Sequence, residues 1–181
     1  MAQFIAYDPN VEVSGAVILA AIAHLKAEIV PLLEKHEIFD VQPDKWYPLQ
    51  AFLNVLKSIN DGWSFGSSAV DLMSIGMQIP ENAMWPPNVD SVETALGSID
   101  TAYHINHRGG EIGHYRIEFA EPHHIRMVCE NPYPSDFDYG IIYRTVKKFS
   151  HKGQTFQVQR ADSPSRLKGD ELCIYDIFFA D

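Results

Sequence analysis

The chain has 181 residues, which is enough for a single domain with a core that needs no disulfide or metal to be stable. Hydrophobic residues make up 46% of it and aromatic residues 12%, a composition that excludes an intrinsically disordered chain. Acidic residues outnumber basic ones by 24 to 14, and the net charge of −10 argues against binding to nucleic acid or to an anionic membrane. We therefore expect one domain over residues 1–181, with no nucleic-acid partner and no membrane insertion.

The cysteines and the N-terminus bear on the cellular compartment. Cys129 and Cys173 are the two cysteines of the sequence, and no Cys/His spacing typical of a zinc site occurs. Residues 1–4 lack the basic region of a signal peptide, and the most apolar run, 16–23, is too short to span a bilayer. The sequence thus predicts a cytoplasmic protein without a disulfide framework.

Residues 1–110 are expected to be mainly helical, because apolar residues recur there at helical spacing. A first helix is predicted to begin at Ser14, a favourable N-cap, and Pro31 should break or kink it. A second helix follows Pro43–Asp44 and ends at 60–62.

Two further helices are predicted in this half. One spans Ser67–Met77. The other begins at a capping-box-like pair, Asp90 with Glu93, and ends at Gly109–Gly110.

Residues 111–181 change from helical to strand periodicity. Side chains alternate between apolar and polar over 114–119 and again over 124–130, a pattern that predicts a hairpin with one buried face. A helix is expected from Ser135, with Asp138 completing a capping box, and a second hairpin follows over 156–179. The predicted class is α+β, with N-terminal helices packed on a four-stranded antiparallel sheet of ββ-α-ββ order.

The histidines are the main candidates for chemistry. Asp100, His104 and His107 are spaced i, i+4 and i+7 on one predicted helix, so they project from one side of it. Three interpretations stay open: a polar outer face, a transition-metal site made by all three residues, and a ligand contact made by His104 alone. Nucleotide-binding and hydrolase motifs are absent from the sequence, so an enzyme has little support.

Aromatic residues with a polar atom, such as Tyr103 and Tyr133, often line small-molecule pockets and are equally common in ordinary cores. Cys129 and Cys173 fall on the predicted inner faces of their strands, where we expect them to act as small hydrophobic residues.

The segments 131–140 and 166–175 resemble the C-terminal pattern of the vinyl reductase-type ligand-binding domains, whose fold is shared with H-NOX haem sensors and TRAPP vesicle-tethering subunits. The resemblance extends over roughly 40–179. It implies that an apolar or planar ligand, with haem as a possible cofactor, is held between the helices and the sheet.

The H-NOX resemblance implies roles for individual residues. H-NOX domains carry a proximal histidine on the helix before the first hairpin, and His104 lies on the corresponding helix as the candidate ligand of a haem iron. They follow it with a Tyr-x-Ser-x-Arg motif that binds the haem propionates. Here the matching positions are Tyr133, Ser135 and Phe137, and Phe137 replaces the arginine that would neutralise a propionate.

The favoured hypothesis is a sensory or signalling domain that binds a small apolar or planar molecule and acts on a protein partner or as a homodimer. Its expected ligand-binding residues are His104, Tyr103, Cys129, Tyr133, Ser135 and Phe137. The alternatives are a TRAPP-like scaffolding protein with no exchangeable ligand, and a metal-dependent enzyme that uses Asp100, His104 and His107.

Overall fold

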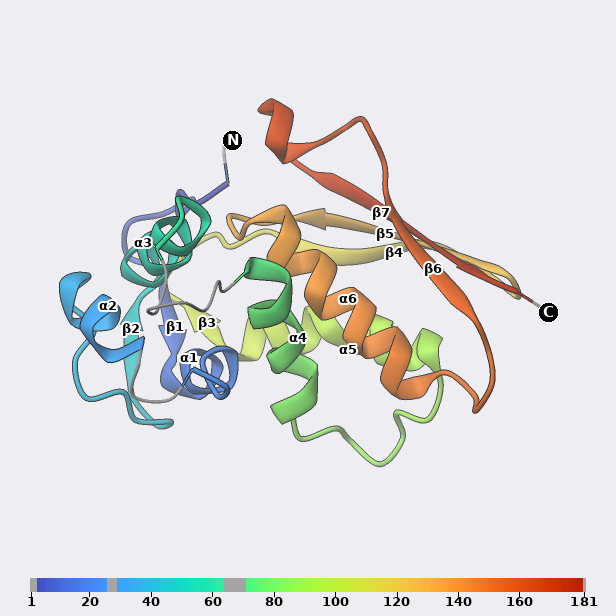
Figure 1. Ribbon diagram of the computed structural model, residues 1–181, viewed down its shortest axis with the longest axis horizontal. Coiled ribbons are helices and arrows are strands. Elements are labelled where there is room, and N and C mark those ends of the chain that lie inside the picture. Colours follow the sequence, from blue (N-terminus) through green and yellow to red (C-terminus); the bar gives the residue numbers. More distant parts are fainter. Residues whose placement is uncertain (1–2, 26–28, 64–70, 181) are drawn as a thin grey trace.

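The computed structural model describes residues 3–25, 29–63 and 71–180. Its helices and strands follow one another along the chain as shown in Figure 1. The helices are α1 (Gly15–Ala21), α2 (Val30–Lys35), α3 (Leu49–Asn60), α4 (Leu72–Asn82), α5 (Val92–Ile105) and α6 (Ser135–Phe149). The strands are β1 (Glu12–Ser14), β2 (Trp46–Pro48), β3 (His107–Arg108), β4 (His114–Glu121), β5 (His124–Glu130), β6 (Phe156–Arg160) and β7 (Cys173–Phe179).

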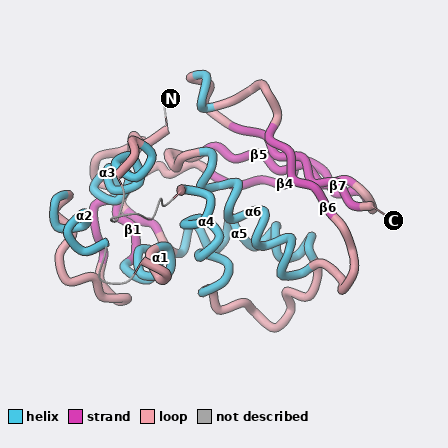
Figure 2. Tube along the Cα trace, in the orientation of Figure 1, coloured by secondary structure: helices cyan, strands magenta, loops and turns pink. Residues whose placement is uncertain are grey.

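The larger sheet has four strands in the order β4-β5-β7-β6, and all its neighbours are antiparallel. The α5 and α6 helices lie along one face of this sheet, and α4 packs beside α6 (Figure 1). At the other end of the molecule, α1, α2 and α3 gather around a small sheet, β2-β1-β3 (Figure 2). The predicted α+β class, with helices on a four-stranded antiparallel sheet, is confirmed.

The two predicted hairpins form as β4–β5 and β6–β7. One strand departs from simple alternation, because a bulge between Ile117 and Phe119 shifts the register of β4 against β5. Phe119 then pairs with Arg126 and lies against that guanidinium, on the outer face of the sheet.

The beginnings of two helices differ from prediction. The N-cap of α5 is Ser91, which forms a capping box with Thr94, one residue later than the predicted pair of Asp90 and Glu93. The N-cap of α6 is Pro134, whose side chain cannot form a cap hydrogen bond. The predicted capping box of Ser135 and Asp138 does not form, because Ser135 is the first residue of the helix and the buried Asp138 carboxylate accepts from Tyr115.

The N-terminal helices are shorter than predicted. Two separate helices, α1 and α2, replace the single helix expected from Ser14, and Pro31 lies in the first turn of α2, where no donor is lost. The predicted helix Ser67–Met77 lies partly outside the described residues; its described part belongs to α4, which begins after the N-cap Asp71 and continues to Asn82. None of the described helices is long and apolar enough to cross a bilayer.

The most extensive packing between helices is the contact of α4 with α6. A Cβ placed on Gly76 would lie 2.1 Å from the carbonyl oxygen of Phe137, and one on Gly140 would lie 2.2 Å from that of Met73. The two backbones therefore touch at positions where any side chain would force the helices apart.

This contact predicts that Gly140→Ala lowers the free energy of unfolding by about 1–3 kcal/mol, because backbone atoms must move to admit a methyl group. Gly97→Ala is the matched control in α5, where the nearest atom to an added Cβ is 3.8 Å away. That control should gain about 0.5–1 kcal/mol from helix propensity. Urea unfolding of the three proteins measures both effects, and equal stability of the two variants would contradict the close approach.

Candidate functional site

His104 lies on the outside of the molecule. Its side chain is 51% exposed, and its Nδ1 lies 2.9 Å from the carbonyl oxygen of Asp100. The buried stripe of α5 consists of Ala95, Leu96, Ile99 and Tyr103. A ligand contact in the interior, expected for His104, would require an imidazole that points inward, and this ring points outward because position 104 is rotated by about 100° from Tyr103 on the helix.

The three residues proposed as a metal site do not converge. The Oδ1 atom of Asp100 accepts the backbone N–H of Tyr115 at 2.8 Å, and His107 lies past the end of α5 in β3 with a buried ring. Among the described residues, no group of three His, Cys, Asp or Glu side chains is placed to hold a metal ion.

The buried histidine of this region is His107, which is 7% exposed. Its Nδ1 lies 2.8 Å from the carbonyl oxygen of Tyr103, so Nδ1 carries the proton and donates it. Its Nε2 therefore accepts the hydroxyl proton of Tyr133, at 2.8 Å. Burial lowers the pKa of His107 from 6.5 to about 4, so the ring is neutral at neutral pH.

Aromatic rings fill the interior between α3, α5 and α6. Tyr133 stacks on Phe137 at 5.1 Å and makes edge contacts with Phe52 at 6.4 Å and Tyr103 at 6.1 Å. Tyr103 in turn contacts Tyr115, whose ring centroid is 5.1 Å away. All of these aromatic residues are buried, so they form a packed core.

A buried ion pair lies beside this core. Arg166 and Asp138 have side chains that are 0% exposed, and Nη2 of the arginine donates to Oδ2 of the carboxylate. The hydroxyl of Tyr115 donates to Oδ1 at 2.6 Å, and Nη1 of Arg166 donates to Oδ1 of Asn131 at 2.6 Å. The carboxylate therefore has several donors, as a buried charge requires.

Ser135 is also engaged within the protein. Its backbone N–H donates to Oε1 of Gln3 at 3.0 Å, and its hydroxyl lies 3.2 Å from the same atom and 3.1 Å from Sγ of Cys173. Cys129 and Cys173 are buried, as the sequence predicted.

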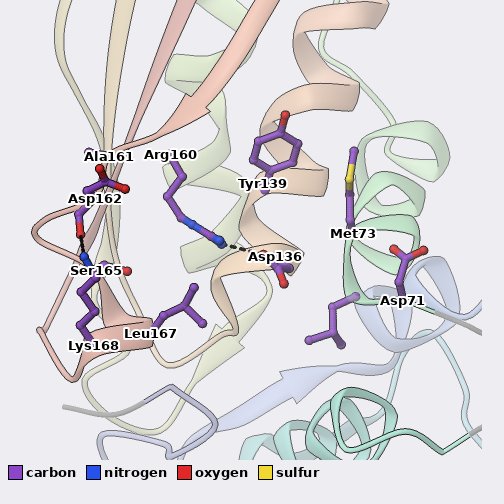
Figure 3. A pocket seen from close by; sticks show the side chains of 11 residues that line it. Asp71, Met73, Asp136, Tyr139, Arg160, Ala161, Asp162, Ser165, Leu167 and Lys168 are labelled. Carbon is purple, nitrogen blue, oxygen red and sulfur yellow. Dashed lines mark hydrogen bonds and ion pairs between the residues drawn. The ribbon is translucent and has the colours of Figure 1, made fainter.

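A cleft of about 700 Å³ opens on the surface where α4, α6 and β6 meet (Figure 3). Its walls carry apolar and charged side chains together. They are Asp71, Leu72, Met73, Asp136, Tyr139, Arg160, Ala161, Asp162, Ser165, Leu167 and Lys168.

Two cations of the cleft have partners within it. Nη1 of Arg160 donates to Oδ1 of Asp136 at 2.6 Å, and Nζ of Lys168 donates to the carbonyl oxygen of Asp162 at 2.7 Å. The arginine points across the cleft toward α6, as Figure 3 shows. The cleft thus combines a partly exposed ion pair with apolar side chains in its lining.

A second cavity of about 420 Å³ lies between α1 and α2. Its lining is mostly aliphatic: Leu19, Ile22, Ala23, Ile29, Val30, Leu33, Glu34, Ile38, Asp40 and Val41. Neither this cavity nor the cleft contains any of the six residues that the sequence suggested for ligand binding.

The sequence could have pointed to Asp138, because it falls in helical register with Ile141, Ile142 and Thr145 on the buried face of α6. A charge on an apolar stripe requires a buried partner. The identity of that partner, Arg166, follows from the fold alone.

No protein-family model matches the chain, and no curated protein matches it either. Solved structures do match over nearly the whole chain. An H-NOX protein from S. oneidensis, solved with Fe(II) bound to NO, is 13% identical, with a TM-score of 0.69 over 93% of this chain and 99% of that one. This chain has the H-NOX fold.

Two other H-NOX structures show the same likeness. The protein from K. algicida is 12% identical and has a TM-score of 0.62, covering 93% of this chain and 97% of that one. A variant from T. Tengcongensis is 15% identical and has a TM-score of 0.59, covering 91% and 96%. At these identities the likeness establishes the fold, and the further resemblance to vinyl reductase-type and TRAPP proteins stays a prediction.

The residues of this chain do not fit a haem in the interior. Tyr133, Ser135 and Phe137 are the residues that the sequence resemblance matched to the propionate motif. The first two are hydrogen-bonded within the protein, and the third stacks on Tyr133. Both ring nitrogens of His107 have partners, and His104 faces outward. Inserting a porphyrin would expel packed rings and leave its carboxylates without the arginine cation.

The depressed pKa of His107 predicts a pH dependence of stability. The unfolded chain takes up a proton below pH 6.5, while folded His107 does so only near pH 4, so its contribution to stability is complete above 6.5 and is lost as the pH falls. The difference amounts to about 2–3 kcal/mol between pH 7 and pH 4.

The variant His107→Gln keeps hydrogen-bonding atoms and does not titrate, so it is the matched control. The difference in unfolding free energy between wild type and variant should shrink steadily from pH 7 to pH 4. A difference that stays constant over this range would contradict the assignment of a buried neutral imidazole.

Proposed function

We propose that this protein is a small-molecule-binding sensory domain of the H-NOX fold that works without haem and binds its ligand in the surface cleft. The observation that carries the proposal is that the interior is packed with side chains, while a cleft is open on the surface. Tyr103, Tyr133 and Phe137, which the resemblance suggested for ligand binding, are buried in the packed interior, and the cleft of about 700 Å³ has a size typical of small-molecule sites.

The lining of the cleft favours a ligand with an apolar body and at least one charged or hydrogen-bonding group. Leu72, Met73 and Leu167 supply the apolar surface. Arg160 and Asp136 form an ion pair whose side chains are 27% and 53% exposed, so both can exchange hydrogen bonds with a ligand.

The position of the cleft supports a signalling role. Its walls come from α4 in the N-terminal half and from α6 and β6 in the C-terminal half (Figure 3). A ligand that contacts these elements together stabilises one arrangement of α4 against α6 over others, and a partner protein or a second copy of the chain can respond to that difference.

In this proposal Tyr103, Cys129, Tyr133, Ser135 and Phe137 build the core that supports the cleft. His104 is a surface residue whose role as an iron ligand has no support in its surroundings.

The packed interior also favours a second candidate, a scaffolding protein with no exchangeable ligand. Such a protein needs a stable surface for partners and has no use for a cleft that binds small molecules. The two candidates differ in what happens when the cleft is filled.

The variant Ala161→Phe should fill the cleft, since Ala161 is in its wall. Ala120→Phe adds the same ring at an exposed position of β4, away from the cleft, and is the control. In a ligand-observed NMR screen with one fragment library, wild type and Ala120→Phe should give the same binders. Ala161→Phe should weaken them about tenfold or more. Binders that Ala161→Phe does not weaken would place the site elsewhere, and an absence of binders would favour the scaffold.

A further inference from the structure

We infer that Cys129 and Cys173 form a site of reversible oxidation, at which a hydroperoxide converts the two thiols into an intramolecular disulfide. The inference is independent of the proposed function, because it depends on strand register and on the contacts of one thiol.

The register of the sheet places the two cysteines directly opposite each other. Cys129 of β5 pairs with Cys173 of β7, at the last rung of the ladder that these strands share. Directly opposed residues point to the same face, and both residues are 0% exposed on the inner face of the sheet. Opposed Cα atoms in antiparallel strands lie about 4.5–5.5 Å apart, within the range of disulfide-bonded cysteines.

The two thiols differ in their surroundings. Sγ of Cys173 lies 3.1 Å from the hydroxyl of Ser135 and accepts the backbone N–H of Arg166 at 3.2 Å. Burial raises the pKa of this thiol, but these hydrogen bonds and the Arg166 cation outweigh burial and lower it. At Cys129, burial dominates and raises the pKa well above its usual value. Cys173 is therefore the thiol that reacts first.

The reaction balances with a hydroperoxide as the oxidant. The Cys173 thiolate attacks hydrogen peroxide, the O–O bond breaks, and the products are a sulfenic acid and hydroxide. The Cys129 sulfur then displaces the sulfenic oxygen, forming the S–S bond, and that oxygen leaves as water. Two thiols are oxidised by two electrons in total, and one peroxide is reduced to two molecules of water.

The end of the ladder gives the oxidant a route of access. Strand ends open locally at lower cost than strand centres, and hydrogen peroxide is small enough to use such openings. Opposed pairs along β5 and β7 alternate between hydrogen-bonded and non-hydrogen-bonded. The Phe179 N–H donates to the His123 carbonyl, so these two residues form a hydrogen-bonded pair. Counting along the register from there, Cys129 and Cys173 are also a hydrogen-bonded pair. A disulfide there draws the two Cβ atoms closer than the relaxed ladder does, and strained disulfides are readily reduced.

Oxidation has a structural consequence at the cleft. When Sγ of Cys173 bonds to Cys129, it no longer holds the Ser135 hydroxyl at the start of α6 or the Arg166 amide. Ser165, the neighbour of Arg166, and Asp136, the neighbour of Ser135, both line the cleft.

The test exposes the reduced, folded protein to an excess of hydrogen peroxide and follows its intact mass. We expect a loss of two hydrogen atoms per chain, a peptide that links Cys129 to Cys173, and full reversal by dithiothreitol. Unchanged mass, or a disulfide that joins two chains, would overturn the inference.

Two variants resolve the order of the steps. In Cys129→Ser the reaction stops at the sulfenic acid, so dimedone should label Cys173. In Cys173→Ser the remaining Cys129 should be labelled about tenfold more slowly or not at all. Circular dichroism checks that both variants are folded, and the wild-type mass measurement stands without them. Equal labelling of the two cysteines would contradict the roles assigned to them.

Discussion

The structure depends on the buried ion pair between Arg166 and Asp138. Both side chains are removed from water, so each requires the other and further hydrogen bonds. Asn131 bridges them, accepting from Arg166 and donating to Asp138, and Tyr115 closes the network from β4. The pair therefore joins the first turn of α6, the turn that follows β5 and the segment before β7.

This network determines how the interior is filled. With Asn131 and Asp138 both held, the six residues between them have little freedom, and Tyr133 and Phe137 are directed into the space between α3 and α5. The hydroxyl of Tyr133 is hydrogen-bonded to Nε2 of His107, so this buried hydroxyl has a partner. The H-NOX fold is thus present with a packed aromatic interior between α3, α5 and α6, and a cleft of about 700 Å³ lies at the junction of α4, α6 and β6.

Much of the fold follows from the sequence, for identifiable reasons. Both hairpins follow from alternation, because one face of each strand is buried, and α5 follows from its apolar stripe. The small sheet cannot be predicted from the sequence, because strands of two or three residues are too short to show an alternation of apolar and polar residues. The candidate site was harder to predict from the sequence. His104 and His107 share a face of the predicted helix, but α5 ends at Ile105, so His107 lies beyond the helix and the two rings do not face the same way. The cleft is lined by segments that lie far apart in the chain, so no local sequence pattern predicts it.

The protein's own side chains fill the interior between α3, α5 and α6, so we expect that it does not take up haem. The decisive experiment is a titration of the purified protein with hemin, followed by absorption in the Soret region, with His104→Ala and His107→Ala for comparison. We predict that wild type and both variants give the same spectrum, that of hemin without a histidine ligand. A Soret band of bound haem in wild type that disappears in either variant would show that the interior admits haem.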